Sequence, residues 1–297
     1  MKISEVLCRK TLAFSLEIFP PKRDRPIESI YPTIDRLSAL KPDYISVTYG
    51  AGGSAAQQQV TCQLASHIQN TCGIIPLAHL TCINSTAAQV DAMLMALKAA
   101  KIENVLALRG DRVVETQVSP DFYHATDLIS HISAHGGFDI AAACYPEGHP
   151  DSDSVESDII YLKQKVDRGA THLVSQLFFD NEDFFQMFAL CEKAGIKVPI
   201  QAGIMPVVNA KQIERMVSLC GAKLPRKFAK IMARYGDNPQ ALFDAGLCYA
   251  TEQIIDLFAS GVSGVHLYTM NNPIIAETIY KSIENILISA NGDVSEA

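Results

Sequence analysis

The chain has 297 residues, of which 48% are hydrophobic and 19% charged, and its formal net charge is −7. This composition excludes a disordered chain, a collagen and a coiled coil, and the mild acidity argues against a nucleic-acid-binding protein. No apolar run approaches the roughly 18 residues of a membrane span. The apolar stretch after Lys10 is interrupted by Ser15 and Glu17, so it does not resemble a signal peptide. We expect a cytoplasmic protein.

Short apolar runs alternate with amphipathic segments along the whole chain. The expected strands cover residues 14–19, 44–49, 74–82, 104–109, 139–145, 172–179, 199–205 and 264–270. Between them lie helical segments such as 86–101, whose apolar residues recur every three or four positions. Apolar strands separated by helices indicate a parallel sheet covered on both faces.

Eight such units predict a (β/α)₈ TIM barrel, an α/β fold of about this length. We expect a single domain over residues 1–297, an extra helix around 225–235 before the last barrel helix, and a polar tail from about 290. A doubly wound open sheet is the alternative fold. That fold usually carries a glycine fingerprint after its first strand, whereas Pro20 and Pro21 follow the first strand here.

The eight cysteines include no pair at the close spacing of zinc ribbons and iron–sulfur clusters. We interpret them as free thiols, with Cys82 and Cys144 buried in strands. His79, His149 and His266 belong to no H-x-H or H-E-x-x-H motif, so no metal site is predicted.

Polar residues stand at the carboxyl end of nearly every expected strand, where a barrel places its active site. They are Glu17, Thr48, His79, Thr81, Arg109, Asp111, Tyr145, Gln176, Tyr268 and Asn271. A barrel with a purely structural role has less reason to gather so many hydrogen-bonding and ionisable groups there.

Glu17 is the sharpest candidate among these residues. Strand alternation places Phe14, Leu16 and Ile18 on the helix-facing side, so Glu17 is expected to point into the barrel mouth. An apolar setting would raise its pKa toward the range useful to a general acid. The alternative is a structural role in an internal ion pair, for which Arg109 is the most plausible partner.

Three further segments allow a functional and a structural interpretation. Asp111, after Gly110, either contacts a ligand or caps a turn. The stiff segment 145–150 combines a tyrosine and a histidine with two prolines, which would hold both side chains at fixed positions. Asp158 and Lys165 share one helix face with Tyr161, which the spacing alone would make a solvated face. The expected strands contain no lysine for a Schiff base, and no G-x-S-x-G elbow occurs, so a polar-ligand site with one acid catalyst is favoured.

Eight motifs make the chain recognisable as a set. In chain order they are SLEIFPPK, SVTYGAGGS, AHLTCI, ALRGD, YPEGHP, SQLFFD, AGIMPV and HLYTMN. Together they resemble the motifs of the bacterial methylenetetrahydrofolate reductases, from about residue 14 to residue 272.

The resemblance implies a flavoprotein with tightly bound FAD and NADH or NADPH as co-substrate. Such an enzyme reduces 5,10-methylenetetrahydrofolate to 5-methyltetrahydrofolate by a ping-pong hydride relay and supplies methyl groups for methionine synthesis. Glu17 matches the general acid of the family, and Asp111 matches the aspartate beside the flavin and the pterin. The positions that match FAD-binding residues are Thr48, His79, Arg109, Gly110, Asp111, Ala125, Tyr145, His149, Asp158 and Lys165. Gln176 and Gln212 match folate-binding positions, and Lys165 would approach the FAD phosphates.

The chain departs from the family pattern at three places. The loop between Asp111 and Ala125 is slightly longer than the usual bacterial form, which bears on the match of Ala125. Asn272 stands where an arginine that grips the folate tail is usual, with Lys211 or Arg215 as substitutes. Met216 stands where an aromatic residue that stacks on ligands is usual.

The resemblance also implies a homo-oligomer that binds folate and a nicotinamide nucleotide, without nucleic acid or membrane. If an iron–sulfur partner subunit takes part, as in some bacterial relatives, its cluster lies on that other chain. Two other readings stay open: another FAD barrel oxidoreductase such as proline dehydrogenase, and a non-catalytic flavin-binding subunit of a larger complex.

Overall fold

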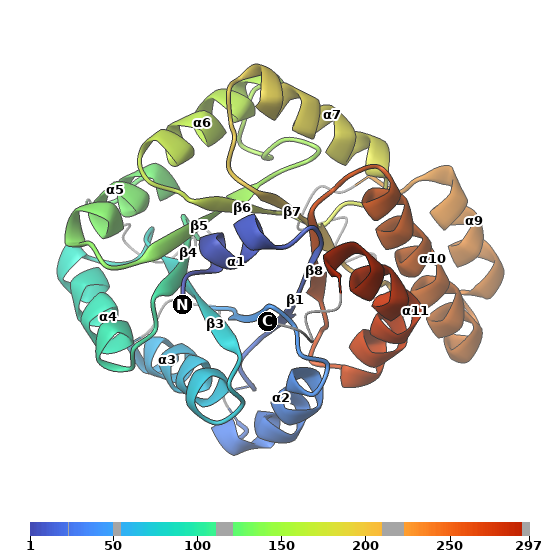
Figure 1. Cartoon of the computed structure of the whole chain (residues 1–297), viewed down its shortest axis with the longest axis horizontal. Helices are drawn as coiled ribbons and strands as arrows, with labels where there is room; N and C mark the ends of the chain where they lie inside the picture. Colours follow the sequence, from blue (N-terminus) through green and yellow to red (C-terminus); the bar gives the residue numbers. More distant parts are fainter. Residues whose placement is uncertain (23, 50–54, 111–120, 210–222, 293–297) are drawn as a thin grey trace.

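Eight parallel strands close into a barrel in chain order, and β8 pairs back with β1 (Figure 1). The computed structural model describes residues 1–22, 24–49, 55–110, 121–209 and 223–292. The strands are β1 (Ala13–Ile18), β2 (Tyr44–Val47), β3 (Ile75–Thr81), β4 (Asn104–Leu108), β5 (Asp139–Cys144), β6 (His172–Ser175), β7 (Ile200–Ile204) and β8 (Gly264–Tyr268). The predicted barrel is confirmed. Strand β6 ends four residues before the expected boundary.

Helices surround the barrel on its outer side (Figure 1). They are η1 (Ile27–Ile30), α2 (Tyr31–Ser38), α3 (Ala55–Asn70), α4 (Ala87–Ala99), α5 (Ala125–His135), α6 (Val155–Asp167), α7 (Asn181–Lys193), α9 (Arg226–Tyr235), α10 (Pro239–Ala259) and α11 (Pro273–Asn291). Helix α9 confirms the extra helix expected around 225–235, and it packs outside α10. Helix α11 extends to Asn291, slightly beyond the expected start of the tail. None of the described helices is long and apolar enough to cross a membrane.

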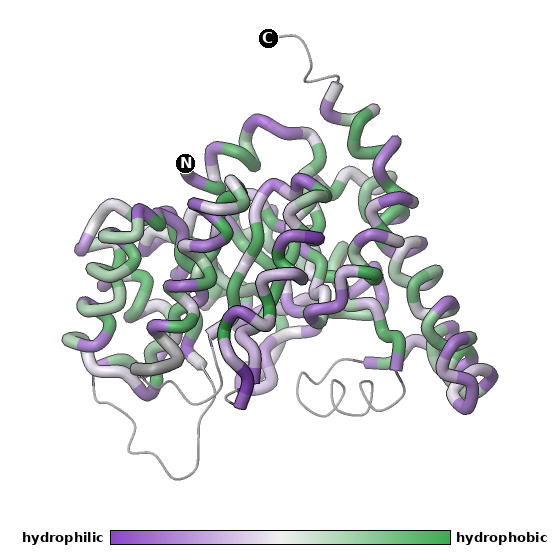
Figure 2. The backbone as a smooth tube through the Cα atoms, turned by 90° about the horizontal axis from the view of Figure 1, so that it is seen from below, coloured by the Kyte–Doolittle hydropathy of each residue, from purple (hydrophilic) through white to green (hydrophobic). Residues whose placement is uncertain are grey.

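The main hydrophobic core lies between the strands and the helices. Leu16 and Ile18 of β1 are fully buried in this shell, together with side chains such as Leu94 of α4 and Ile279 of α11. Figure 2 shows the matching hydropathy pattern, with the strands largely hydrophobic and the surrounding helices alternating between hydrophobic and hydrophilic residues. The strand alternation predicted for β1 is therefore confirmed, and its polar side chains are left to the barrel interior.

A short helix that the sequence analysis did not anticipate, α1 (Ile3–Arg9), lies across the amino end of the barrel (Figure 1). Its Ile3 and Leu7 pack against Leu77 and other side chains from the starts of the strands. The strands also cap this helix. Asn104 Oδ1 accepts the Ile3 N–H at 2.9 Å, and Asp139 Oδ2 accepts the Ser4 N–H at 2.8 Å. These bonds satisfy amide groups at a helix start that otherwise lacks a side-chain cap.

A hydrogen-bonded chain of polar side chains fills the middle of the barrel. The Tyr44 hydroxyl donates to Gln201 Oε1, and the Gln201 amide donates to Ser15 Oγ at 3.2 Å. Ser15 Oγ lies 2.8 Å from His266 Nδ1. The Ser15 hydroxyl also donates to the Val265 carbonyl at 3.2 Å. These contacts hold the ring of a histidine that points toward the mouth.

His172 is a second histidine enclosed by the barrel, and it is fully buried. Its Nδ1 lies 3.8 Å from Asp139 Oδ2, while the Asp139 carboxylate is also bonded to Ser4 and to Thr171. Burial lowers the pKa of His172 from 6.5 to about 4, although the Asp139 charge opposes this shift. The folded protein thus holds a neutral imidazole that becomes protonated more readily when the chain unfolds.

This difference predicts how stability depends on pH. A folded pKa below the unfolded value means that the stabilisation is fully present above about pH 6.5 and is lost as the pH falls toward 4. Between pH 6 and 5 we expect His172 to contribute a loss of about 1.4 kcal/mol in unfolding free energy per pH unit. The unfolding free energy of His172→Gln can be measured by urea unfolding at several pH values. Plotted against pH, this free energy should change less steeply than that of the wild type, by about 1.4 kcal/mol per pH unit. His124→Gln, which changes an exposed imidazole, should keep the wild-type slope. Equal slopes for wild type and His172→Gln would contradict the assignment.

Candidate active site at the barrel mouth

Glu17 stands at the end of β1 and points into the barrel, as predicted. Its Oε2 accepts a hydrogen bond from Ser46 Oγ at 3.2 Å and lies 3.4 Å from His79 Nε2 and 3.5 Å from His266 Nε2. The side chain keeps only 17% of its surface exposed. Three strands, β2, β3 and β8, therefore hold one carboxylate at the mouth.

The alternative structural role, an ion pair between Glu17 and Arg109, is wrong. Arg109 Nη1 instead binds Asp151 Oδ2 at 2.7 Å, on the loop before α6. Glu17 belongs to β1, whose neighbours are β2 and β8, whereas Arg109 follows β4. The histidines close to Glu17 take the place that the sequence analysis had given to the guanidinium.

The expected rise in the pKa of Glu17 is also wrong for this arrangement of side chains. Burial does act to raise the pKa, but the hydrogen bond from His266, the neighbouring His79 and the Ser46 hydroxyl lower it by more. The net pKa lies below its ordinary value. Glu17 is thus a carboxylate at neutral pH, stabilised by the histidines and the hydroxyl group around it.

His79 is nine-tenths buried beside Glu17 and is electrically neutral at physiological pH. Burial lowers the pKa of His79 from 6.5 to about 4, even though Glu17 acts in the opposite direction. Its Nε2 is close to Glu17 but makes no hydrogen bond to any described residue. A buried polar atom left in this way is costly, which points to a ligand as its partner.

A cavity of about 180 Å³ opens beside Glu17. Its wall includes Phe19, Gln176 and Tyr268, so it brings together residues that follow β1, β6 and β8. Gln176 is held at the wall because its Oε1 accepts the Leu177 N–H at 2.8 Å. The cavity thus combines a carboxylate, an amide and aromatic surface, which suits a flat polar ligand.

A glycine allows the ring of Tyr268 to reach across this wall. The Tyr268 hydroxyl donates to the Ser175 carbonyl at 2.7 Å, directly over Gly203 of β7. A Cβ atom at Gly203 would lie 2.2 Å from the Ser175 carbonyl oxygen and 2.8 Å from the Tyr268 hydroxyl. Any side chain at this position would therefore displace the tyrosine.

A cationic group lies on the opposite side of the ring of strands, where α6 packs on β5. Lys165 Nζ donates to the Ala143 carbonyl at 2.9 Å and lies 5.8 Å from the centre of the Tyr145 ring. Burial lowers the pKa of Lys165, and Asp158 opposes this shift. Among the described residues no carboxylate forms an ion pair with this ammonium. The interpretation of a solvated helix face is wrong for Lys165 and Asp158, and holds for Tyr161, which is 52% exposed.

The segment 145–150 folds back between this lysine and Arg109. Gly148 adopts φ +83° and its N–H donates to the Tyr145 carbonyl at 3.0 Å, which closes a turn. The turn brings His149 edge-on to the Tyr145 ring at 4.6 Å. Burial lowers the pKa of His149, and the positive Arg109 lowers it further. The expected rigid tyrosine–histidine unit is present in the structure.

The remaining predicted residues lie in four places. Thr48 is half-buried at the end of β2, and Ala125 begins α5. Gly110 has φ +87° and packs on Thr81, so the chain turns sharply there. Asp111 and Gln212 lie outside the described residues, as do Lys211, Arg215 and Met216. Asn272 caps α11, because its Oδ1 accepts the Ile274 N–H at 3.1 Å.

Sequence reasoning missed three residues that contact Glu17. Ser46 and His266 occur inside apolar strands rather than at their ends, so a search of strand ends passed over the serine and considered the histidine only as a metal ligand. The signal that could have found them is strand alternation, which puts both on the inner face. Thr269 was also missed, and its Oγ1 donates to the Glu17 carbonyl at 2.6 Å.

Comparison with solved structures supports the fold. A protein from Clostridium thermocellum, described as an uncharacterized protein that binds two copies of 5-methyl-5,6,7,8-tetrahydrofolic acid, has a TM-score of 0.71. The match covers 97% of this chain and 100% of that chain. At 14% identity this likeness is evidence for the fold alone.

Comparison with known sequences gives the family. The family profile described as Methylenetetrahydrofolate reductase matches residues 2–284. Methylenetetrahydrofolate reductase (NADH) 1 of Arabidopsis thaliana is 38% identical over 91% of this chain, which spans about half of that protein (48%). The 5,10-methylenetetrahydrofolate reductase of Pectobacterium carotovorum is 35% identical over 86% of this chain and 85% of its own length. The chain belongs to the methylenetetrahydrofolate reductase family.

Proposed function

We propose that this chain reduces 5,10-methylenetetrahydrofolate to 5-methyltetrahydrofolate, with NADH or NADPH as electron donor and FAD as resident cofactor. The observation that carries the proposal is the Glu17 carboxylate, nearly enclosed beside a cavity that Gln176 and Tyr268 also line. Family membership supports the reaction, and the folate ligand of the solved structure from Clostridium thermocellum supports the substrate class.

The residues of the mouth fit FAD as a cofactor. Lys165 offers a half-buried ammonium that, among the described residues, donates to a main-chain carbonyl and forms no ion pair, which suits a phosphate. His79 offers a buried Nε2 without a hydrogen-bond partner among the described residues, which suits a polar atom of a flavin. Gly110 lets the main chain approach a flat ligand closely. When bound, FAD accepts a hydride from the nicotinamide and passes a hydride to the folate.

The proton that the reaction consumes suggests the role of Glu17. Conversion of the methylene bridge to a methyl group consumes one hydride and one proton, and the carbon–nitrogen bond of the bridge breaks. The nitrogen that leaves the carbon needs a proton, and Glu17 is the carboxyl group that lines the cavity. Ser46 and His266 hold this group in place, so the acid and the substrate meet in a fixed geometry.

The lowered pKa of Glu17 sets a condition on this role. An acid must hold a proton, whereas the carboxylate is the favoured form in the arrangement described above. A folate ring in the cavity would exclude the remaining water from Glu17 and strengthen the effect of burial, which raises the pKa. Folate binding would thus convert the carboxylate into a proton donor only when substrate is present.

Glu17→Gln tests the assigned proton donor. The amide keeps the shape but cannot donate a proton as an acid, so oxidation of the reduced flavin by methylenetetrahydrofolate should slow by about 100-fold or more. Flavin reduction by the nicotinamide nucleotide should change by less than about threefold, because it needs no proton from Glu17. Anaerobic stopped-flow absorbance measures both half-reactions.

Glu192→Gln, which makes the same change at an exposed site on α7, is the matched control and should leave both rates unchanged. Equal losses in the two half-reactions of Glu17→Gln would instead assign a structural role. A wild-type protein that stays colourless after addition of FAD would contradict the proposed cofactor.

Lys165→Met tests the cation in FAD binding. Removing a charge-assisted hydrogen bond worth about 1.5–3 kcal/mol should raise the Kd of the apoprotein for FAD by roughly 10- to 100-fold. Quenching of flavin fluorescence on titration measures the Kd without turnover. Lys163→Met removes the neighbouring lysine of α6, whose ammonium pairs with Asp167 on the outer face, and should leave the Kd within about twofold. Similar losses in both variants would argue against a specific contact.

A further inference from the structure

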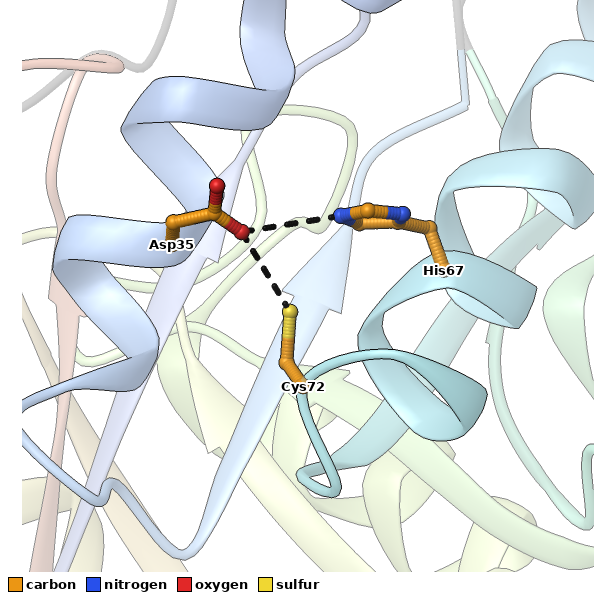
Figure 3. A group of neighbouring side chains, drawn as sticks. All are labelled: Asp35, His67 and Cys72. Atoms are coloured by element: carbon orange, nitrogen blue, oxygen red, sulfur yellow. Dashed lines mark hydrogen bonds and ion pairs between the residues drawn. The ribbon is translucent and has the colours of Figure 1, made fainter.

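Three potential metal-binding side chains meet on the outer side of the barrel, away from the proposed active site. Asp35 comes from α2, His67 from the end of α3, and Cys72 from the turn that leads into β3 (Figure 3). Their ligand atoms all lie within 4.8 Å of one another. Helix α2 leads into the amino end of β2, and the turn at Cys72 leads into the amino end of β3. The cluster therefore lies toward the amino ends of the strands. In barrels that end serves stability rather than catalysis.

The two distances that involve Asp35 are close to the ligand separations of a tetrahedral zinc site. Asp35 Oδ1 lies 3.7 Å from His67 Nε2 and 3.8 Å from Cys72 Sγ. Two ligands at about 2.0–2.3 Å from a tetrahedral Zn²⁺ are separated by roughly 3.4–3.6 Å. The three ligand atoms lie within 4.8 Å of one another, so small side-chain rotations, including that of the exposed Asp35, would bring them into range of one ion.

The local structure holds two of the ligands in place before any ion binds. The Tyr31 ring stacks on the His67 imidazole at 4.1 Å with an interplanar angle of 8°, which fixes the ring plane. The Cys72 N–H donates to the His67 carbonyl at 3.3 Å, so the thiol is anchored to the last turn of α3. Figure 3 shows the His67 nitrogen and the Cys72 sulfur converging on one carboxylate oxygen.

One nitrogen atom of the cluster lacks a hydrogen-bond partner among the described residues. His67 Nε2 is buried and makes no hydrogen bond to a described residue, although Asp35 is nearby. A buried imidazole nitrogen without a hydrogen bond is costly, and a metal ion would satisfy it. In the absence of an ion, the Cys72 thiol donates to Asp35 Oδ1 at 3.8 Å. Binding of a metal would release this proton to solvent and form the thiolate ligand.

We propose that Asp35, His67 and Cys72 bind a Zn²⁺ ion that ties α2 to the end of α3. Sulfur, nitrogen and oxygen donors together favour a borderline-soft ion such as Zn²⁺ over Mg²⁺ or Ca²⁺. Three protein ligands leave the fourth position to water. The ion stabilises the folded chain because the ligands come from separate elements that only the fold brings together.

Cobalt substitution tests the site directly. The full-length protein, stripped with a chelator, should bind one equivalent of Co²⁺ with a thiolate-to-cobalt charge-transfer band in the near ultraviolet, and Zn²⁺ should displace it. Cys72→Ser should lose this band. Cys62→Ser removes another partly buried thiol of α3 and should keep it. Asp35→Asn changes an exposed side chain, so the fold is retained, and should weaken Co²⁺ binding by about tenfold or more.

Thermal unfolding gives the second readout. Zn²⁺ should raise the Tm of the wild type and of Cys62→Ser but not that of Cys72→Ser or Asp35→Asn. Absence of the charge-transfer band in the wild type, or a band that survives in Cys72→Ser, would overturn the proposal. Equal binding by wild type and Asp35→Asn would overturn it as well. These outcomes are independent of the folate reaction, since none of the three residues lines the barrel mouth.

Discussion

The structure depends on holding one carboxylate inside a closed barrel. Burying an ionised group is costly unless donors satisfy it, and Glu17 obtains them from Ser46 and His266. His266 in turn is fixed from below by Ser15, so the polar interior serves the mouth. Polar side chains therefore occupy space in the barrel centre that apolar side chains could otherwise fill. Hydrophobic stabilisation comes mainly from the shell between strands and helices, and α1 adds a smaller cluster that closes the amino end.

The negative and the positive side chains lie on different sides of the barrel mouth. The Glu17 carboxylate belongs to the β8–β1–β2 side, and the cations Arg109 and Lys165 belong to the β4–β6 side across the barrel. This polarity fits the proposed function, in which the phosphates of FAD would meet the cations and the folate ring would meet Glu17. The net charge of the chain has no part in this, because a few local groups create the field.

Much of this organisation could be predicted from the sequence. All eight strands and α9 lie close to their expected positions, because apolar periodicity and β-branched composition reflect burial on both faces of a parallel sheet. The inward direction of Glu17 followed from alternation alone. The side chains that contact Glu17 could not be predicted in this way, because contacts inside a barrel depend on the stagger between strands that are distant in sequence. The lowered pKa of Glu17 is a consequence of those partners, and α1 was missed because its caps come from Asn104 and Asp139, far along the chain.

The sequence by itself determined the fold class, the order of the strands and the set of polar residues at their carboxyl ends. Only the tertiary structure decided which of them meet. Lys165 lies on a helix face that spacing alone would leave in solvent, yet its ammonium turns inward to the Ala143 carbonyl of β5 and is half-buried. Asp35 and Cys72 are separated by more than thirty positions, and the turn after α3 brings them together. Periodicity reports which side of an element is buried, whereas contacts between elements depend on how the closed barrel sets them against one another.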